Sequence, residues 1–314
     1  MTDQTGRRRQ AILVVTHGSQ AVLAQLMAIL DDPEIDFFVH VDARTPGTAA
    51  DALSAAVTRS GISFQAPRLA VNWGSARMLD VTMALLSRAL PGCYDRYHLI
   101  SGQDLPLCTA PEFKEFFGAR PTYEYVGFID DDFSDRVRYF YALQSVMARG
   151  TLLGRGLDRM QAVGVRGQQM LGVDRVKNAG MRPKFGPNWF SITHGLASHV
   201  VSRSDWITGT FARTQCADEV FLQTVLGESP FAGNRDPDRV HRDGSAQALR
   251  LIDWTRGSPH TWIGADLDTV LASDCVFARK FAPGDTETIR TVAEMVRTRP
   301  WPGLRPPEAD ENRA

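Results

Sequence analysis

The sequence predicts an α/β fold with a mostly parallel central sheet and helices on both faces. Short apolar, β-rich runs alternate with segments of helical spacing through the first 110 residues. This βαβα order is typical of parallel sheets, because each crossover helix covers one face of the sheet. With 314 residues, of which 43% are hydrophobic and 23% charged, the chain can bury a large core.

The N-terminal elements follow one another closely. The run Ala11-Ile-Leu-Val-Val15 predicts a buried strand, and residues 19–30 carry apolar residues at helical spacing before Asp31-Asp32-Pro33 ends the helix. The next predicted elements are a strand at 36–42, a helix at 49–60, a strand starting at 62–64, a helix at 75–90 and a strand at 97–100. All the predicted strands are short and apolar, as in a sheet that is covered on both faces.

The middle of the chain, residues 130–187, differs in composition. It is rich in Arg, Gly and Gln with weaker periodicity, and we expect helices at 140–147 and 157–170 and loops over 173–187. Beyond it the expected elements are a strand at 189–192, helices at 194–202 and 217–226, a strand at 249–253 and a helix at 265–272.

The domain organisation follows from the absence of internal repeats and linkers. We expect a flexible basic lead over 1–10 and one domain over 11–285, in which 130–187 is a variable insert. A C-terminal helix and a disordered tail are expected over 286–314.

Charge and cysteine usage exclude several classes. Lys and Arg number 35 against 36 Asp and Glu, a net charge of -1, which disfavours a nucleic-acid partner. The four cysteines are widely spaced without a CxxC pair, which fits neither a zinc ribbon nor a disulfide scaffold and favours a cytoplasmic protein. No apolar run approaches the roughly 18 residues of a transmembrane segment. The Arg7-Arg8-Arg9 tail is either a solvated lead or a peripheral contact at the inner membrane face.

Common catalytic motifs are absent. The sequence has no Walker A loop, no GxGxxG after the first strand, no HExxH and no GxSxG. These absences count against kinases, Rossmann dehydrogenases, zincins and α/β-hydrolases.

Polar residues follow the predicted strands, at the edge where such sheets bind ligands. His17 follows the first strand, and Asp42 ends the second, where a carboxylate can bind ribose hydroxyls or a uracil imide, or cap a turn. Asp104 lies in the polar turn after the strand at 97–100. Trp73 stands just before a predicted helix, either in the core or at a ligand.

Three charged clusters carry alternative interpretations. Asp130 and Asp132 form a DxD that can hold Mg²⁺ or Mn²⁺, or belong to a solvated loop. Asp218-Glu219 starts a predicted amphipathic helix; one acid can cap it while the other acts as a general base, or both are favoured by the helix dipole. Arg279-Lys280 lies in an apolar frame, at a diphosphate or at the rim of the core.

Eight segments in order resemble the core-2/I-branching β-1,6-N-acetylglucosaminyltransferase and peptide O-xylosyltransferase family, glycosyltransferase family 14. The matching segments are 12–17, 38–42, 71–74, 97–106, 188–192, 217–224, 249–254 with 257–260, and 273–281. The resemblance covers nearly the whole chain and is weakest over 130–187.

The resemblance implies a GT-A-like fold and an inverting, metal-independent transfer from a UDP-sugar to a hydroxyl, forming a β-glycosidic bond. It implies that Glu219 is the catalytic base, that Lys280 binds the donor diphosphate and that Asp42 lies near the uridine. It places Trp254 near the acceptor sugar. We expect the donor side to include His17, Trp73 and Arg279 as well, and the acceptor side Asp104 and Arg138, with Arg136 as a further candidate; no cofactor or metal is expected.

The sequence departs from the family in one respect. The segment after Pro259-His260 lacks the second cation that family members often carry, and Arg279, Arg250 or Arg256 can replace it. N-acetylglucosamine or xylose is the expected sugar; the acceptor is a glycan, a lipid-linked sugar, a peptide or a small molecule. A bacterial-type cytoplasmic enzyme fits this chain, and the rival hypotheses are a metal-dependent transferase using Asp130 and Asp132 and a non-catalytic sugar-binding protein.

Overall fold

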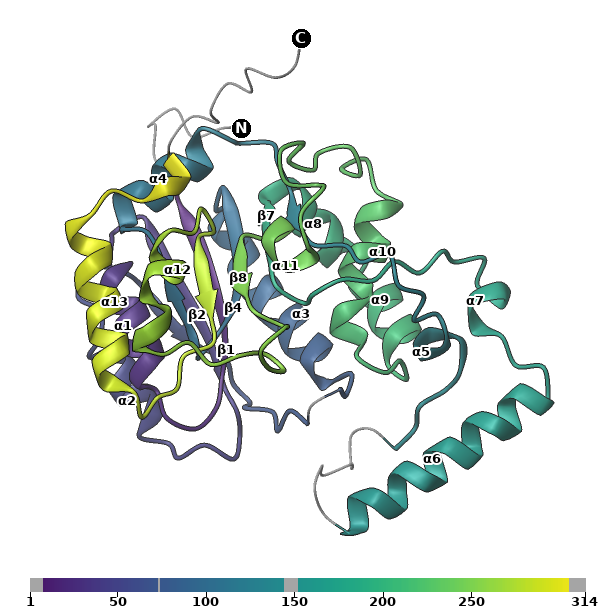
Figure 1. Cartoon of the computed structure of the whole chain (residues 1–314). Helices are drawn as coiled ribbons and strands as arrows, with labels where there is room; N and C mark the ends of the chain where they lie inside the picture. The colour runs from purple at the N-terminus through teal and green to yellow at the C-terminus, as the bar shows by residue number, and fades with distance from the viewer. Residues whose placement is uncertain (1–7, 73, 144–151, 305–314) are drawn as a thin grey trace.

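A central six-stranded sheet organises the molecule. The computed structural model describes residues 8–72, 74–143 and 152–304 (Figure 1). The strands, in spatial order, are β3 (Ile62–Phe64), β2 (Ile35–Val41), β1 (Gln10–Thr16), β4 (Arg96–Ser101), β7 (Phe190–Thr193) and β6 (Tyr125–Val126). The first four are parallel to one another, and β7 runs antiparallel to both β4 and β6. The predicted α/β class with a mostly parallel sheet is confirmed.

Helices cover both faces of this sheet because successive residues of a strand point to opposite sides. In β1, Ile12 and Val14 enter one buried cluster, and Ala11 and Leu13 enter the other. The first cluster includes side chains of α1 (Ala21–Ile29), α2 (Ala49–Ser54), α4 (Ala110–Gly118), α12 (Leu267–Leu271) and α13 (Thr286–Thr298). The second includes side chains of α3 (Arg77–Ala89), α8 (His194–Ser202), α9 (Ser204–Phe211) and α10 (Phe221–Gly227). Figure 1 shows these two groups on either side of the strands.

A second, three-stranded sheet was not predicted. It consists of β5 (Asp104–Pro106), β9 (Phe277–Arg279) and β8 (Arg250–Ile252), with β9 antiparallel to β5 and parallel to β8. In this sheet Arg279 is paired with both Asp104 and Ile252. The C-terminal third of the chain therefore reaches the carboxyl end of β4.

The chain ends require two corrections to the expected organisation. Arg9 belongs to the expected flexible lead, but it forms an ion pair with Asp36 (3.2 Å) and donates a hydrogen bond to the carbonyl of Gly92 (2.6 Å). The predicted C-terminal helix is present as α13, and its buried face packs in the first core cluster, so position 285 does not separate it from the domain. Residues 1–7 and 305–314 lie outside the described residues.

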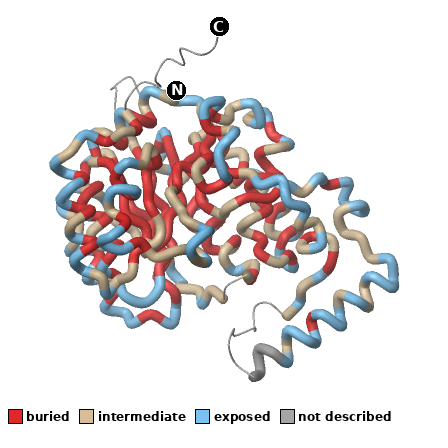
Figure 2. The backbone as a smooth tube through the Cα atoms, viewed as in Figure 1, coloured by how far each residue is buried: buried red, intermediate tan, exposed pale blue. Residues whose placement is uncertain are grey.

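Part of the insert at 130–187 projects from the body of the molecule. It contains α5 (Asp135–Arg138), α6 (Leu152–Met170) and α7 (Arg175–Asn178). α6 confirms the helix predicted at 157–170. The helix predicted at 140–147 is wrong over residues 140–143, which are not helical, and its remaining residues lie outside the described residues. α6 extends away from the sheet (Figure 1) and most of its described surface is exposed (Figure 2).

The remaining elements are short. They are α11 (Gly244–Gln247) and the 3-10 turns η1 (Leu90–Gly92), η2 (Ala217–Glu219), η3 (Gly264–Asp266) and η4 (Pro302–Leu304). Among the described helices, none has the length and apolar character needed to cross a bilayer.

Candidate active site

Glu219 lies on a turn, not at the start of the single helix predicted over 217–226. The turn η2 ends at Glu219, Val220 has φ -131° and ψ -44°, and α10 begins only at Phe221. The turn is closed by the amide of Glu219, which donates to the carbonyl of Cys216 (3.0 Å). Because the helix is broken here, the Asp218-Glu219 pair is held by the turn.

The Glu219 carboxylate is partly accessible and faces one cation. Its side chain is 37% exposed, and Oε2 lies 2.7 Å from Nη1 of Arg136. The guanidinium of Arg136 also lies over the ring of Phe133, 4.1 Å from its centroid. Of the two arginines proposed from the insert, Arg136 contacts the expected base, whereas Arg138 pairs with Asp135 and Asp174.

Asp218 precedes the expected base and contacts Asn188. Burial, reinforced by the negative charge of Glu219, raises the pKa of Asp218 to about 7, although hydrogen bonding with Asn188 opposes the shift.

Asp104 is the ion-pair partner of Arg279. Their side chains form an ion pair of 3.1 Å, and Asp104 also accepts hydrogen bonds from the amide (2.8 Å) and hydroxyl (3.0 Å) of Ser101. The other face of the guanidinium lies 4.7 Å from the ring centroid of Trp189. Asp104 has no exposed surface, so it positions Arg279 and does not fit the acceptor contact that we expected.

Lys280 directly follows Arg279 and is half-buried. Its carbonyl accepts a hydrogen bond from the amide of Trp262 (2.9 Å), and the next amide, of Phe281, donates to the carbonyl of Gln103 (3.0 Å). Within the described parts of the chain, no hydrogen bond or ion pair engages its ammonium. These contacts place a cation beside the turn that follows β4.

Contacts connect the surroundings of Arg279 with those of Glu219. Arg279 stacks on Trp189, the preceding Asn188 contacts Asp218, and Glu219 follows. Arg279 and the expected base, 60 positions apart in the chain, therefore lie along one continuous set of contacts, and Lys280 directly follows Arg279. Sequence reasoning quoted Asn188 and Trp189 as part of a matching segment but did not assign them to the site; their place in that segment was the available signal.

The remaining donor-side predictions have different surroundings. Both oxygens of Asp42 accept two hydrogen bonds each, from Arg44 and from the amide of Val71. Burial alone would raise the pKa of Asp42, but these hydrogen bonds outweigh it and lower the pKa below the usual range. Asp42 therefore anchors a turn as well as ending β2, and His17 is exposed after β1. Trp73 lies outside the described residues.

The three arginines considered as the second cation at the diphosphate have different surroundings. Arg250 is buried and donates to the carbonyls of Leu99 (2.9 Å) and Phe190 (3.0 Å), so it holds the two sheets together. Arg256 pairs with Asp253 and Asp266. Arg279 is the candidate that adjoins Lys280.

On the acceptor side, Trp254 is 56% exposed and its indole donates to the hydroxyl of Ser245 (3.2 Å). Ser245 lies in α11, which packs closely against Gly127 and Pro187. Gly186, the residue before Pro187, donates its amide to the carbonyl of Glu219 (3.0 Å). Trp254 is thereby connected to the expected base through backbone contacts.

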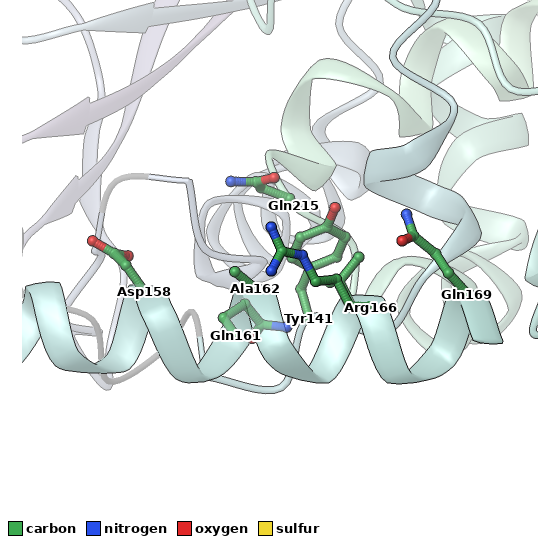
Figure 3. Close-up of a pocket in the computed structure, with 8 residues that line it drawn as sticks. Tyr141, Asp158, Gln161, Ala162, Arg166, Gln169 and Gln215 are labelled. Carbon is green, nitrogen blue, oxygen red and sulfur yellow. The ribbon is translucent and has the colours of Figure 1, made fainter. Parts of the chain in front are cut away.

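A pocket of about 400 Å³ lies between α6 and the segment before η2 (Figure 3). Its lining is mostly polar or charged and comprises Tyr141, Asp158, Gln161, Ala162, Val165, Arg166, Gln169 and Gln215. The amide of Gln215 donates to the carbonyl of Arg136 (3.1 Å), the residue paired with Glu219. One backbone hydrogen bond therefore connects a residue that lines the pocket to the arginine that is paired with the expected base.

Comparisons with known proteins find xylosyltransferases among the curated relatives of this chain. Xylosyltransferase oxt of Drosophila pseudoobscura pseudoobscura is 23% identical over 303 residues, which cover 90% of this chain and 33% of that protein. Xylosyltransferase 2 of Rattus norvegicus is 24% identical over 291 residues, 87% of this chain and 32% of that protein. The chain thus spans about a third of the length of these relatives.

Two solved structures share a more distant likeness. Mouse xyloside xylosyltransferase 1, in its apo form, has a TM-score of 0.36 and 10% identity, covering 86% of this chain and 96% of that one. Core-mannan synthase A from Aspergillus fumigatus, in a Mn/GDP form, has a TM-score of 0.34 and 12% identity, covering 72% of each chain. Neither likeness carries weight at these scores.

The family assignment comes from the sequence model. The model described as "Branch: Core-2/I-Branching enzyme" matches residues 11–268, which include η2, β8 and the insert. The chain belongs to the Core-2/I-branching enzyme family, a family of glycosyltransferases.

Proposed function

We propose that this protein is an inverting, metal-independent glycosyltransferase that moves a sugar from a UDP-sugar to an acceptor hydroxyl. One observation carries the proposal: the contacts from Arg279 through Trp189 and Asn188 to Asp218 and Glu219. They connect Arg279, which Lys280 directly follows, with a carboxylate suited to deprotonate an acceptor; the two cations are suited to a leaving diphosphate.

The proposed reaction is a single displacement. The Glu219 carboxylate takes the proton of the acceptor hydroxyl while its oxygen attacks the anomeric carbon. The bond from that carbon to the UDP oxygen breaks, its electron pair stays on the diphosphate, and Lys280 and Arg279 offset the developing charge. Attack opposite the leaving group inverts the anomeric centre and forms a β-glycosidic bond.

A metal-dependent reaction through Asp130 and Asp132 is the rival. Asp132 accepts a hydrogen bond from the amide of Ser134 (2.8 Å), and both acids are exposed. Within the described ranges no group of three His, Cys, Asp or Glu side chains is placed to hold a metal. Activity in EDTA discriminates: full activity supports the proposal, and lost activity restored by Mn²⁺ supports the rival.

We propose xylose as the first donor sugar to test, because the curated relatives are xylosyltransferases, and N-acetylglucosamine as the second. A thermal-shift panel of UDP-sugars identifies the donor, since a ligand at about 100 times its Kd stabilises by about 2.7 kcal/mol. The acceptor is a glycan, a lipid-linked sugar, a peptide or a small molecule.

Glu219→Gln is the decisive variant. The amide keeps the shape of the side chain but cannot accept the proton, so we expect turnover to fall by about 10²- to 10⁴-fold while UDP binding is retained. Glu228→Gln, an exposed acid after α10, is the matched control and should retain wild-type turnover. If Glu219→Gln keeps full turnover, Glu219 is not the base; if wild type binds UDP-sugars without turnover, the chain is a binding protein.

A further inference from the structure

The proposed reaction uses no residue of the pocket that lies between α6 and the segment before η2 (Figure 3). Its volume of about 400 Å³ is within the range of pockets that bind small ligands in proteins. Most such pockets are lined chiefly by apolar side chains, whereas this lining includes a tyrosine, three glutamines, an aspartate and an arginine. The lining therefore points to a ligand that is rich in hydrogen-bonding groups.

One side of α6 supplies most of this lining. Asp158, Ala162, Arg166 and Gln169 follow one another at intervals of four, four and three residues, so they lie on the same side of the helix. Tyr141 and Gln215 belong to other segments and complete the lining (Figure 3). The pocket is therefore formed by the insert together with the segment that leads to η2.

Hydrogen bonds hold α6 beside the segment that contains Tyr141. Gln168 accepts a hydrogen bond from the amide of Phe140 (2.7 Å) and donates to the carbonyl of the same residue (3.0 Å). Gln161 accepts from the amide of Leu143 (3.1 Å) and donates to the carbonyl of Phe140 (3.3 Å). The two walls are therefore fixed relative to each other before a ligand binds, which lowers the entropy cost of binding.

The polar side chains of α6 in this pocket are available to a ligand. Asp158, Arg166 and Gln169 are exposed, and among the described residues no side-chain hydrogen bond or ion pair engages any of them. The pocket is lined by one carboxylate and one guanidinium, so its formal charges cancel. A ligand of high net charge, such as a second nucleoside diphosphate, is not favoured by this balance.

The lining matches the hydroxyl groups of a sugar. A hydroxyl both donates and accepts hydrogen bonds, as a glutamine amide does, while Arg166 only donates and the ionised Asp158 only accepts. Tyr141 supplies an aromatic ring against which the apolar face of a sugar can pack. A lipid chain, or the apolar side chains of a peptide, would find only Ala162 and Val165 as aliphatic partners.

The pocket lies near the expected base. Gln215 precedes Glu219 by four residues, so their Cα atoms are at most about 14 Å apart even if the chain between them were extended. The amide of Gln215 also donates to the carbonyl of Arg136 (3.1 Å), whose Nη1 lies 2.7 Å from Oε2 of Glu219. A short glycan chain can therefore place one sugar in the pocket and present another to Glu219.

We propose that this pocket binds one sugar of an uncharged oligosaccharide. Resting on the proposed function, we assign that oligosaccharide as the acceptor, with the hydroxyl of another of its sugars at Glu219. Among the acceptor classes named above, this assignment selects a glycan. Arg166 and Gln169 then determine specificity, because they bind a part of the acceptor that does not react.

The test measures glycan binding by the full chain without a donor. Labelled protein is applied to an array of uncharged oligosaccharides, acidic oligosaccharides and peptides, and the uncharged oligosaccharide that binds best is titrated by calorimetry. We expect Arg166→Gln to weaken this binding by about 10-fold and Gln169→Ala to weaken it by about 3-fold or more. Arg290→Gln, a change at an exposed position of α13, is the matched control and should bind like wild type.

Kinetics separate this proposal from the proposed function. With the bound oligosaccharide as acceptor, Arg166→Gln should raise its KM by about 10-fold and leave kcat nearly unchanged. The proposal is overturned if wild type binds no uncharged oligosaccharide, if it binds only acidic oligosaccharides or peptides, or if both pocket variants bind as tightly as wild type. It is also overturned if a UDP-sugar is turned over but the bound oligosaccharide receives no sugar. Binding that the pocket variants weaken, without any turnover, supports the glycan site and contradicts the proposed function.

Discussion

The carboxyl edge of the central sheet and the insert at 130–187 differ in which side chains are buried and which are exposed. At the sheet edge, charged groups are buried: Asp104 has no exposed surface, and the two Nη atoms of Arg250 donate to backbone carbonyls and one buried hydroxyl. In the insert, polar side chains attach α6 to the body, and three of its large apolar side chains, Met160, Val163 and Met170, are exposed.

The difference suggests that the two regions have different tasks in the proposed reaction. Groups that must hold a diphosphate in one geometry benefit from rigid, buried support, because pre-organised charges need no rearrangement during reaction. A segment that selects an acceptor does not need a dense core. Four variants test this contrast, in order of expected effect.

Arg250→Met should cause the largest loss of stability. Burial lowers the pKa of Arg250 to about 10, so it remains charged at neutral pH, and its removal leaves several buried carbonyls without donors. We expect the free energy of unfolding to fall by about 3 kcal/mol in urea titrations. Arg290→Met, on the exposed side of α13, is the control; similar losses in the two variants would remove the contrast.

Lys280→Ala tests the catalytic part of the sheet edge. Loss of a cation at the departing diphosphate should lower kcat/KM for the UDP-sugar by about 10- to 100-fold with little effect on Tm. Lys177→Ala, in the insert, is the matched control. Unchanged kcat/KM in Lys280→Ala would show that this ammonium does not contact the donor.

Asp218→Asn should stabilise the protein in a pH-dependent manner. The folded pKa of about 7 exceeds the unfolded value of 3.8, so the folded state loses stability as pH rises between these values. The neutral Asn avoids this loss, and we expect a gain in stability that is largest above about pH 7 and disappears below about pH 4. Thermal melts across this range measure it; an equal gain at every pH would mean that Asp218 does not titrate as inferred.

The smallest effect is expected in the insert. Replacing Met160, Val163, Met170 and Leu171 with Gln should change the free energy of unfolding by no more than about 0.5 kcal/mol per site, because these side chains are mostly exposed. Urea titration of this variant gives the value. A larger loss would show that these side chains are covered in solution and would end the contrast with the sheet edge.

Much of the fold could be predicted from local patterns. The strands at 11–15, 36–42, 62–64 and 97–100 correspond to β1, β2, β3 and β4, because apolar runs of this length are characteristic of covered strands. The small sheet could be predicted only in part. β8 lies within the strand predicted at 249–253, whereas β5 and β9 are three residues long, carry little periodic signal and pair across more than 160 positions.

The candidate site divides along the same line. Sequence reasoning selected Glu219, Arg279 and Lys280 by type and by family resemblance, and the structure places two of them on one set of contacts with Lys280 adjacent. It also assigned Asp104 to the acceptor, because nothing in a linear pattern shows that a carboxylate has no exposed surface.

The sequence by itself determined the class of the fold, the family and the residue types available for chemistry, since these depend on composition, local periodicity and motif order. Only the tertiary structure decided which charged groups pair and which apolar side chains are exposed: Asp104 pairs with Arg279, Arg136 pairs with Glu219, and Met160 and Val163 of α6 are exposed. Those outcomes depend on burial and on contacts between distant segments, and a one-dimensional pattern contains neither.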